Sequence, residues 1–310
     1  MEFKHISVLY NETVGGLLVK SGGVYVDGTL GGGGHSMGIL SSAMNVRLIG
    51  IDRDPEAIEA AGKKLAPFGE NVTLVNRNFS EIKSILNDLN IDGIDGAVLD
   101  LGVSSYQLDN AERGFSYMHN SRLDMRMNKD NPKSAYEVIN EYSADELKRI
   151  FYEYGEEKWS ARVAQFIAEK RAQKPIETTF ELVDIIKAAI PKRVRAEGSH
   201  PAKRIFQAVR IEVNNELGIL TPAIKDFVAV LKPGGRIAVI TFHSLEDRII
   251  KNAFSDFATG CGCPKNFPVC VCNRQPVVKI ITKKPILPTR QEELDNSRSK
   301  SAKLRIAEKL

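Results

Sequence analysis

Four consecutive glycines, Gly31 to Gly34, follow a short β-branched stretch that ends in Asp27, and His35 comes directly after them. Glycine has no side chain, so backbone built from it lies open to a ligand. In parallel α/β proteins, ligands bind beyond the carboxyl ends of the strands. The pattern therefore predicts a ligand site at the mouth of a parallel sheet. The alternative is a tight turn that binds nothing.

A second carboxylate, Asp52, ends the next apolar stretch, where it can accept hydrogen bonds from both ribose hydroxyls of a nucleoside. The two acids suit a dinucleotide and S-adenosylmethionine equally well, so the loop has to distinguish these cofactors. A dinucleotide site has the spacing G-x-G-x-x-G, which no glycine from Gly28 to Gly34 begins. S-adenosylmethionine has no pyrophosphate and needs no helix N-terminus directed at one. We therefore predict S-adenosylmethionine.

Polar residues also follow two later apolar stretches. Asp100 is followed closely by Ser104 and Ser105, and His243 stands after a stretch further along the chain. If the first and fourth strands are neighbours, as the doubly wound order requires, Asp100 lies beside the glycine loop. A lone histidine is usually structural, but His35 and His243 both stand at a predicted strand or loop end. These residues are therefore candidates for catalysis.

The elements that position these residues alternate over the first hundred positions. Strands are predicted at residues 24–27, 47–52, 72–76 and 96–101, and helices at 55–65 and 79–89. Such alternation predicts a parallel sheet with right-handed crossovers. The predicted fold class is α/β, with a Rossmann-like sheet of the kind found in S-adenosylmethionine-dependent methyltransferases.

The alternation stops near Ser104 and resumes with a strand at 231–241, whose opening Leu-Lys-Pro-Gly-Gly turn is common in methyltransferases of this fold. Between these points, apolar residues recur with helical spacing, which predicts helices at residues 143–152, 158–172, 178–189 and 201–217. We predict a discontinuous methyltransferase domain, residues 1–105 and 215–310, and an inserted all-helical domain, residues 106–214. An insert that leaves the carboxyl edge of the sheet is expected to cover the substrate.

The predicted helix at 201–217 has two faces. Its apolar stripe contains Ala202, Ile205, Phe206, Val209 and Val213, and its polar face contains Lys203, Gln207, Arg210 and Asn214. The polar face either contacts the substrate or is an ordinary solvated helix surface.

The composition is that of a globular protein, with 43% hydrophobic and 26% charged residues among 310. No apolar run approaches the roughly 20 residues that a membrane span needs. The N-terminus lacks the apolar core of a signal peptide, so we expect a cytoplasmic protein without membrane partners.

The net charge of +4 is unevenly distributed. Residues 187–210 contain seven basic residues against one acid, and residues 273–310 contain ten against four. This distribution predicts a polyanionic partner, with two solvated faces as the alternative. The candidate nucleic-acid contacts are Lys192, Arg193, Arg195, Lys203, Arg204 and Arg210.

All four cysteines lie in one segment, at Cys261, Cys263, Cys270 and Cys272. Disulfides are rare in the cytoplasm. Two C-x-C pairs can supply the four thiolates of a structural zinc site, although C-x-x-C is the more usual spacing. The sequence leaves this question open and gives such a metal no catalytic role.

With these motifs described, the chain resembles the bacterial 16S rRNA (cytosine-N4)-methyltransferases, the RsmH or MraW family. The resemblance spans nearly the whole chain. Its most specific phrases are Leu123-Asp-Met-Arg-Met127 and Phe242-His-Ser-Leu-Glu-Asp-Arg248, and others are the glycine loop, His200-Pro-Ala-Lys-Arg204 and Arg210-Ile-Glu-Val-Asn214. Tyr106 stands where the family usually has proline, and the segment Asn296-Ser-Arg-Ser-Lys-Ser301 departs from the usual Asn-Pro-Arg-Ala-Arg-Ser.

The resemblance implies a substrate, a reaction and a set of cofactor contacts. The substrate is a cytidine in the decoding region of 16S rRNA in the small ribosomal subunit, which is methylated at N4. The inserted domain recognises the substrate, and no obligate protein partner is evident. The implied contacts with S-adenosylmethionine are Gly33, Gly34, His35, Asp52, Phe79, Asp100 and Gln107.

The exocyclic amine of cytosine is a poor nucleophile, so acceptors on its N–H groups would promote attack on the methyl group. Many amino-methyltransferases use a D/N/S-P-P-aromatic phrase, where this chain has Asp100-Leu-Gly-Val103. We expect backbone carbonyls of residues 101–103 to act as acceptors, assisted by Ser104, Ser105 or His243, while Asp100 serves either the cofactor or the base.

The target base must leave its stack to reach the methyl group. Three aromatic residues near the fourth strand, Tyr106, Phe115 and Tyr117, could stack on this base. The alternative role of each aromatic residue is packing in the core.

Other functions remain as alternatives. Methylation at carbon 5 would need a cysteine nucleophile near the fourth strand, where the chain has none. The missing G-x-G-x-x-G spacing argues against an NAD-dependent oxidoreductase. A non-catalytic RNA-binding or assembly protein, and a DNA substrate, are not excluded by the sequence, because basic segments do not distinguish polyanions.

Overall fold

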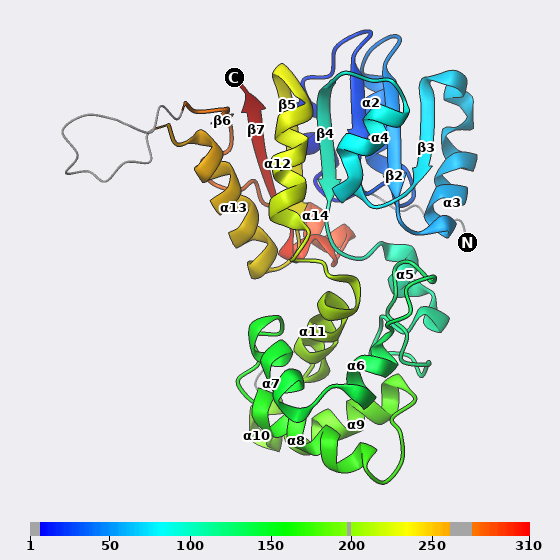
Figure 1. Ribbon diagram of the computed structural model, residues 1–310, viewed down its shortest axis with the longest axis vertical. Helices are drawn as coiled ribbons and strands as arrows, with labels where there is room; N and C mark the ends of the chain where they lie inside the picture. Colours follow the sequence, from blue (N-terminus) through cyan, green and yellow to red (C-terminus); the bar gives the residue numbers. More distant parts are fainter. Residues whose placement is uncertain (1–6, 197–199, 261–274) are drawn as a thin grey trace, which may run out of the picture. The chain divides into compact units, whose positions relative to one another are not determined.

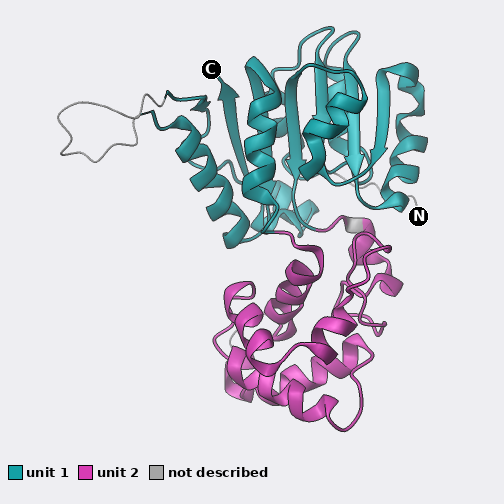
Figure 2. Cartoon of the chain, viewed as in Figure 1, with its two compact units in different colours: residues 1–102, 217–310 teal, residues 103–216 magenta. Residues whose placement is uncertain are grey.

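The computed structural model describes residues 7–196, 200–260 and 275–310 of the chain. The chain divides into two compact units (Figures 1 and 2). Unit 1 contains residues 1–102 and 217–310, and unit 2 contains residues 103–216. Among the described residues, no helix has both the length and the apolar character needed to cross a bilayer.

Unit 1 contains a seven-stranded sheet in the order β3-β2-β1-β4-β5-β7-β6. Its strands are β1 (Val24–Asp27), β2 (Arg47–Asp52), β3 (Val72–Asn76), β4 (Ile94–Asp100), β5 (Leu231–Thr241), β6 (Val278–Ile280) and β7 (Lys303–Lys309). The first five strands pair in parallel, as predicted, and β1 lies between β2 and β4, so the first and fourth strands are the neighbours that the doubly wound order requires. The sheet as a whole is mixed, because β7, a strand outside the predicted alternation, runs antiparallel to both β5 and β6.

Helices cover both faces of this sheet. Unit 1 contains α1 (Tyr10–Leu17), α2 (Gly34–Ser42), α3 (Pro55–Leu65), α4 (Ile82–Asp88), α12 (Leu220–Val230), α13 (Ser244–Ala258), α14 (Arg290–Asp295) and the 3-10 turns η1 (Ala66–Asn71), η2 (Phe79–Glu81) and η4 (Ser299–Ser301). One hydrophobic core packs α4, α12 and α13 against Val26 and Leu99, and the other packs α1, α2 and α3 against Tyr25 and Val98. Successive strand residues therefore point to opposite cores, as the period of a strand requires.

Unit 2 is helical (Figure 2), and its described residues form one hydrophobic core. Its elements are α5 (Ser105–Asp109), η3 (Ala111–Arg113), α6 (Ala135–Glu141), α7 (Ala144–Glu153), α8 (Ser160–Arg171), α9 (Thr179–Ala189), α10 (Lys192–Ala196) and α11 (Ala202–Asn214). The predicted helix at 201–217 ends early, because Asn215 adopts the left-handed conformation at φ 48°. Its predicted apolar stripe is buried throughout.

The starts of several unit 2 helices are set by short polar motifs. In each, a serine or threonine side chain accepts a backbone N–H three residues later while a glutamate at that position reaches back. The pairs are Ser134 with Glu137, Ser143 with Glu146, and Thr178 with Glu181. Such caps satisfy backbone groups that a helix otherwise leaves without partners.

The loop over residues 123–127 is held by the last residue of α11. The Asn214 side chain donates to the carbonyl oxygens of Met125 (2.7 Å) and Arg210 (2.9 Å) and accepts the N–H of Met127 (2.8 Å). Met125 is fully buried and adopts φ 58°, a conformation that costs energy for a residue with a side chain. The Asn214 amide therefore helps to keep this loop in its unusual conformation.

We expect Asn214→Ala to destabilise unit 2 by roughly 1–3 kcal/mol, because it leaves buried backbone groups without hydrogen-bond partners. The only tryptophan of the chain, Trp159, lies in unit 2, so its fluorescence in urea reports on this unit. Asn120→Ala, a change at an exposed loop position of the same unit, is the matched control. Equal unfolding midpoints for the two variants would contradict the role given to Asn214.

Candidate functional site

Four neighbouring strands end in polar side chains at one edge of the sheet. These residues are Asp27 on β1, Asp52 on β2, Asn76 on β3 and Asp100 on β4. The register pairs Asp52 with Asn76 directly, and it pairs Asp27 with Val98, two residues before Asp100. The sheet thus brings three carboxylates from distant parts of the sequence to a common edge, as the strand pattern predicted.

The glycine loop crosses this edge between β1 and α2. Gly33 adopts φ 70°, which glycine tolerates without strain, and α2 begins directly after it. A Cβ added at Gly34 would collide with Ser7, so the bare backbone there accommodates the chain's own N-terminal segment. A Cβ added at Gly32 would meet no atom within 4 Å. Open space for a ligand is therefore found at Gly32, whereas Gly34 is required by packing.

Asp52 joins the loop to the strands. Its two carboxylate oxygens accept the N–H groups of Gly31 (2.8 Å) and Asp54 (2.9 Å), and its carbonyl accepts the Asn76 amide (2.9 Å). Burial raises the pKa of Asp52, although these N–H groups oppose the effect. Each carboxylate oxygen keeps a further lone pair with which it can accept a ligand hydroxyl.

Asp27 is only 1% exposed and lies beneath the loop. Its carboxylate accepts the Ser36 hydroxyl (2.7 Å) and the Thr29 N–H (3.2 Å). Burial raises the pKa of Asp27 to about 6, even though His35 and these donors favour the ionised form. Asp27 therefore ties β1 to the first turn of α2, which also carries His35.

His35 lies between two of the carboxylates. Its Nε2 is 3.6 Å from Asp100 Oδ2, and its ring stacks on Tyr10 with 6.2 Å between centroids. Burial lowers the pKa of His35, but the carboxylates of Asp100 and Asp27 outweigh burial, and the pKa is raised. Among the described residues, neither ring nitrogen of His35 nor the buried Oδ1 of Asp100 has a hydrogen-bond partner. These atoms can therefore take a polar ligand.

Phe79 and His243 complete the edge of the sheet. Phe79, 9% exposed, opens η2 and lies against the start of the loop, because a Cβ on Gly28 would contact it. His243 precedes α13 directly after β5, with its Nε2 3.2 Å from Glu246 Oε1. The other oxygen of Glu246 accepts the N–H groups of Phe242 (2.8 Å) and His243 (3.3 Å), which fixes the backbone that carries the imidazole.

Ser104 and Gln107, which were predicted for catalysis and cofactor binding, belong to unit 2 and cap α5. The Ser104 hydroxyl accepts the Gln107 N–H (3.2 Å), and the Gln107 amide oxygen accepts the Ser104 N–H (3.1 Å). Gln107 is buried, at 5% exposure. Both side chains therefore use part of their hydrogen-bonding capacity within their own helix.

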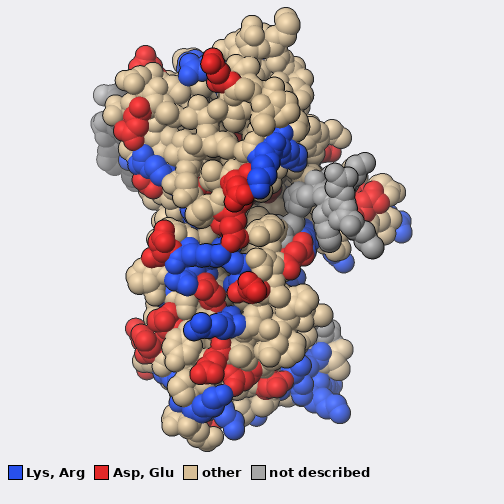
Figure 3. Space-filling model, turned by 90° about the vertical axis from the view of Figure 1, so that its right-hand side faces the viewer, with Lys and Arg blue, Asp and Glu red and all other residues tan. Residues whose placement is uncertain are grey.

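The predicted basic contacts differ in their surroundings. Lys192, Arg193, Lys203 and Arg204 are exposed, whereas Arg195 and Arg210 are half-buried. The Arg210 guanidinium donates to both oxygens of Glu216 (2.8 and 2.9 Å), so a phosphate would have to compete with that carboxylate. On the face drawn in Figure 3, Lys and Arg lie interspersed with Asp and Glu.

The cysteines Cys261, Cys263, Cys270 and Cys272 lie outside the described residues. Within the described ranges, no group of three or more His, Cys, Asp or Glu side chains is arranged to hold a metal ion.

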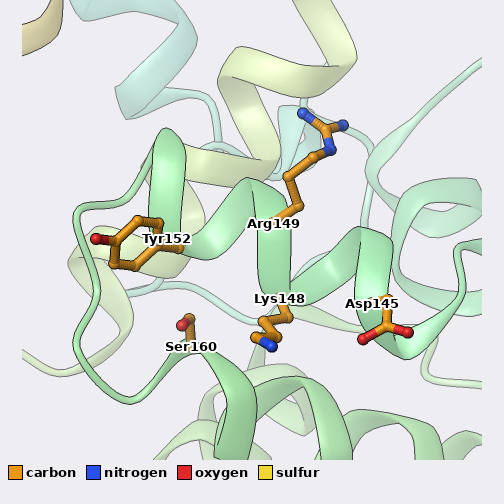
Figure 4. Close-up of a pocket in the computed structure, with 5 residues that line it drawn as sticks. All are labelled: Asp145, Lys148, Arg149, Tyr152 and Ser160. Atoms are coloured by element: carbon orange, nitrogen blue, oxygen red, sulfur yellow. The ribbon is translucent and has the colours of Figure 1, made fainter.

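A pocket that the sequence did not indicate lies in unit 2. It is lined by Asp145, Lys148, Arg149 and Tyr152 of α7 and by Ser160 of α8 (Figure 4). Arg149 is already bonded to Glu153 at 3.1 Å. None of the predicted site residues lines this pocket.

Comparison with known proteins gives full-length matches. The profile of the MraW methylase family matches residues 2–310. A protein named "Ribosomal RNA small subunit methyltransferase H" from Clostridium botulinum (strain Loch Maree / Type A3) is 58% identical, with 100% of both chains covered. A protein of the same name from Clostridioides difficile (strain 630) is 54% identical over 100% of both chains. A crystal structure described as a putative rRNA-methylase from Clostridium thermocellum covers 99% of this chain and 100% of its own, with 13% identity and a TM-score of 0.46.

The raised pKa of Asp27 predicts a pH-dependent stability. The folded protein binds this proton more tightly than the unfolded chain, whose ordinary value is 3.8, so the contribution of Asp27 is greatest below about pH 4 and declines as the pH rises through about 6. Relative to Asp27→Asn, the wild-type protein should lose roughly 3 kcal/mol of unfolding free energy over this range. Urea unfolding followed by circular dichroism from pH 4 to 8 measures the difference.

Ser36→Ala provides the control for this titration. Removing the hydroxyl that stabilises the ionised carboxylate should move the decline to higher pH. A difference between wild type and Asp27→Asn that does not change with pH would refute the assignment.

Proposed function

The chain belongs to the MraW methylase family, and from this premise we propose that it transfers a methyl group from S-adenosylmethionine to N4 of a cytidine in the decoding region of 16S rRNA. The observation that carries the proposal is the 58% identity, over 100% of both chains, with a protein named for methylation of small-subunit ribosomal RNA. The carboxylates at the sheet edge and the glycine loop supply the chemistry that such a reaction needs.

The residues of unit 1 fit S-adenosylmethionine. The cofactor carries an ammonium and a sulfonium, and the edge of the sheet offers Asp100 Oδ1 as a buried acceptor without a partner among the described residues. Asp52 has lone pairs for the ribose hydroxyls, and Gly32 leaves open space beside the backbone. We propose cofactor contacts at Gly33, Gly34, His35, Asp52, Phe79 and Asp100 of unit 1, and at Gln107, which belongs to unit 2.

The bound cofactor would supply an already activated methyl group, so the protein mainly has to orient the cytosine amine. In this proposal, His243 and the backbone carbonyls of residues 101–103 accept the amine N–H groups as positive charge develops on nitrogen. Asp100 holds the cofactor. Ser104 assists less as an acceptor, because one lone pair of its hydroxyl already receives the Gln107 N–H.

We propose that the inserted helical domain, residues 106–214, recognises the RNA. Lys192, Arg193, Lys203 and Arg204 are exposed and can contact phosphates, with Arg195 beside them. Arg210 can do so only by exchanging its bond to Glu216. These contacts would orient the substrate without reading its bases.

Methyl transfer to small ribosomal subunits tests the function. Subunits from a strain that lacks this gene are incubated with the protein and labelled S-adenosylmethionine, and the RNA is digested to nucleosides for mass spectrometry. We expect label in N4-methylcytidine. Label in another nucleoside would refute the position of methylation, and no transfer by protein that binds the cofactor would refute the substrate.

Variants at the sheet edge separate cofactor binding from methyl transfer. Asp100→Ala should weaken S-adenosylmethionine roughly 10- to 100-fold, because it removes a charged hydrogen-bond acceptor. His243→Ala should lower kcat roughly tenfold or more and leave cofactor affinity unchanged. Calorimetric titration gives the affinity, and single-turnover methylation gives the rate.

Two control variants match these changes. Asp92→Ala alters an exposed acid just before β4, at the opposite end of the strand from Asp100. His119→Ala alters an exposed histidine of unit 2. Both should retain wild-type affinity and rate. Wild-type turnover of His243→Ala would exclude His243 from the reaction.

A further inference from the structure

An aromatic stack lies in unit 2 and contains none of the carboxylates described above. The rings of Tyr117 and His200 are parallel within 4°, and their centroids are 4.6 Å apart. Phe206 meets Tyr117 edge-on, with 5.7 Å between centroids and an interplanar angle of 85°. Phe206 is 3% exposed and belongs to the hydrophobic core of the unit, so it anchors the stack to a rigid support.

The outer part of the stack is accessible. Tyr117 and His200 are both partly exposed, in contrast to Phe206. Among the described residues, Tyr117 is the one aromatic ring in contact with His200, so the second face of the imidazole carries no aromatic partner. Met118, the residue after Tyr117, is 66% exposed and adds apolar surface.

The charges around the stack suit a polyanion. Lys187 is close enough to His200 to act on it electrostatically, and Lys203, three residues after His200, is exposed. No acidic partner of Lys187 or Lys203 is found within the described ranges. Burial and the charge of Lys187 lower the pKa of His200, which keeps the imidazole neutral at neutral pH. A neutral ring flanked by lysines can stack on a base while the lysines meet its phosphates.

We propose that Tyr117 and His200 form a stacking site for one unpaired base of the RNA substrate, and that the base continues the stack on the partly exposed imidazole. The inference deepens the function proposed above, since it assumes an RNA substrate, and it concerns a base bound by unit 2. Stacking accepts every base, because each has a flat aromatic face. The site therefore selects single-stranded RNA over a paired duplex.

Binding of a labelled single-stranded RNA oligonucleotide to the full-length chain tests the proposal. Tyr117→Leu and His200→Leu should each weaken binding roughly 5- to 100-fold, the range expected for loss of one base–aromatic contact. Tyr117→Phe keeps the ring and should retain wild-type affinity. The matched control is Tyr152→Leu, which removes a tyrosine of the same unit that is 67% exposed and should have no effect.

Stacking predicts two further signatures. The dependence of affinity on salt should keep its slope in the leucine variants, because no phosphate contact is lost. A series of oligonucleotides with one abasic position should contain a position that weakens binding to the wild-type protein but not to Tyr117→Leu. A purely structural role for the ring would produce neither signature.

Photo-crosslinking to the unaltered protein avoids any effect of the variants on folding. RNA carrying 5-iodouridine should form an adduct with Tyr117 or His200, located by mass spectrometry of peptides. Adducts confined to other residues, or weaker binding of Tyr152→Leu alone, would overturn the proposal. Loss of binding to small ribosomal subunits without loss of binding to RNA would assign the surface to a protein partner, and would also overturn it. RNA affinity is measured without methylation, so failure of the stacking proposal can be distinguished from failure of the proposed methyl transfer.

Discussion

The parallel pairing of β1 with both β2 and β4 is the constraint on which the site depends. It brings the carboxylates of Asp27, Asp52 and Asp100 to one edge of the sheet, where burial makes the negative charges of Asp27 and Asp52 costly. Burial raises the pKa of Asp27 to about 6, and the imidazole of His35 lies against the carboxylate of Asp100. A cationic ligand at this edge compensates these negative charges, so the edge suits a sulfonium better than a pyrophosphate.

The inserted unit is held together by hydrogen bonds between two sequence motifs, residues 123–127 and residues 210–214. Asn214, the last residue of α11, bonds to the buried loop that contains Met125, 89 positions earlier in the chain. The Arg113 guanidinium donates to the carbonyls of Arg126 (3.0 Å) and Met127 (3.2 Å) in the same loop. The backbone of the most specific phrase of this unit, residues 123–127, is therefore held in place by side chains of the unit itself.

Much of the sheet could be predicted, because its central strands are short, apolar and bounded by polar residues. The strands β1, β2, β3 and β5 occupy the predicted residues. The strand β7 was missed, because Lys303 and Arg305 give it the appearance of a basic tail. Arg305 is buried and bonds to Asp247 at 2.6 Å, a partner 58 positions away that no local pattern reveals. The strand-end carboxylates follow from topology, whereas the bond of Ser36 to Asp27 and that of Arg210 to Glu216 depend on side-chain packing.

The chain crosses between the two units at residues 102–103 and again at residues 216–217. Unit 2 begins at Val103, three residues after the carboxylate of Asp100 that ends β4, and the chain returns at Leu217, directly before α12 and β5. Both crossings thus lie in the one connection that separates the strand carrying Asp100 from the strand leading to His243. The first crossing comes three residues after Asp100, whereas α12 and β5 lie between the second crossing and His243. Under the proposal that unit 2 recognises the RNA, its attachment three residues after Asp100 links recognition directly to the strand end where the methyl group is transferred.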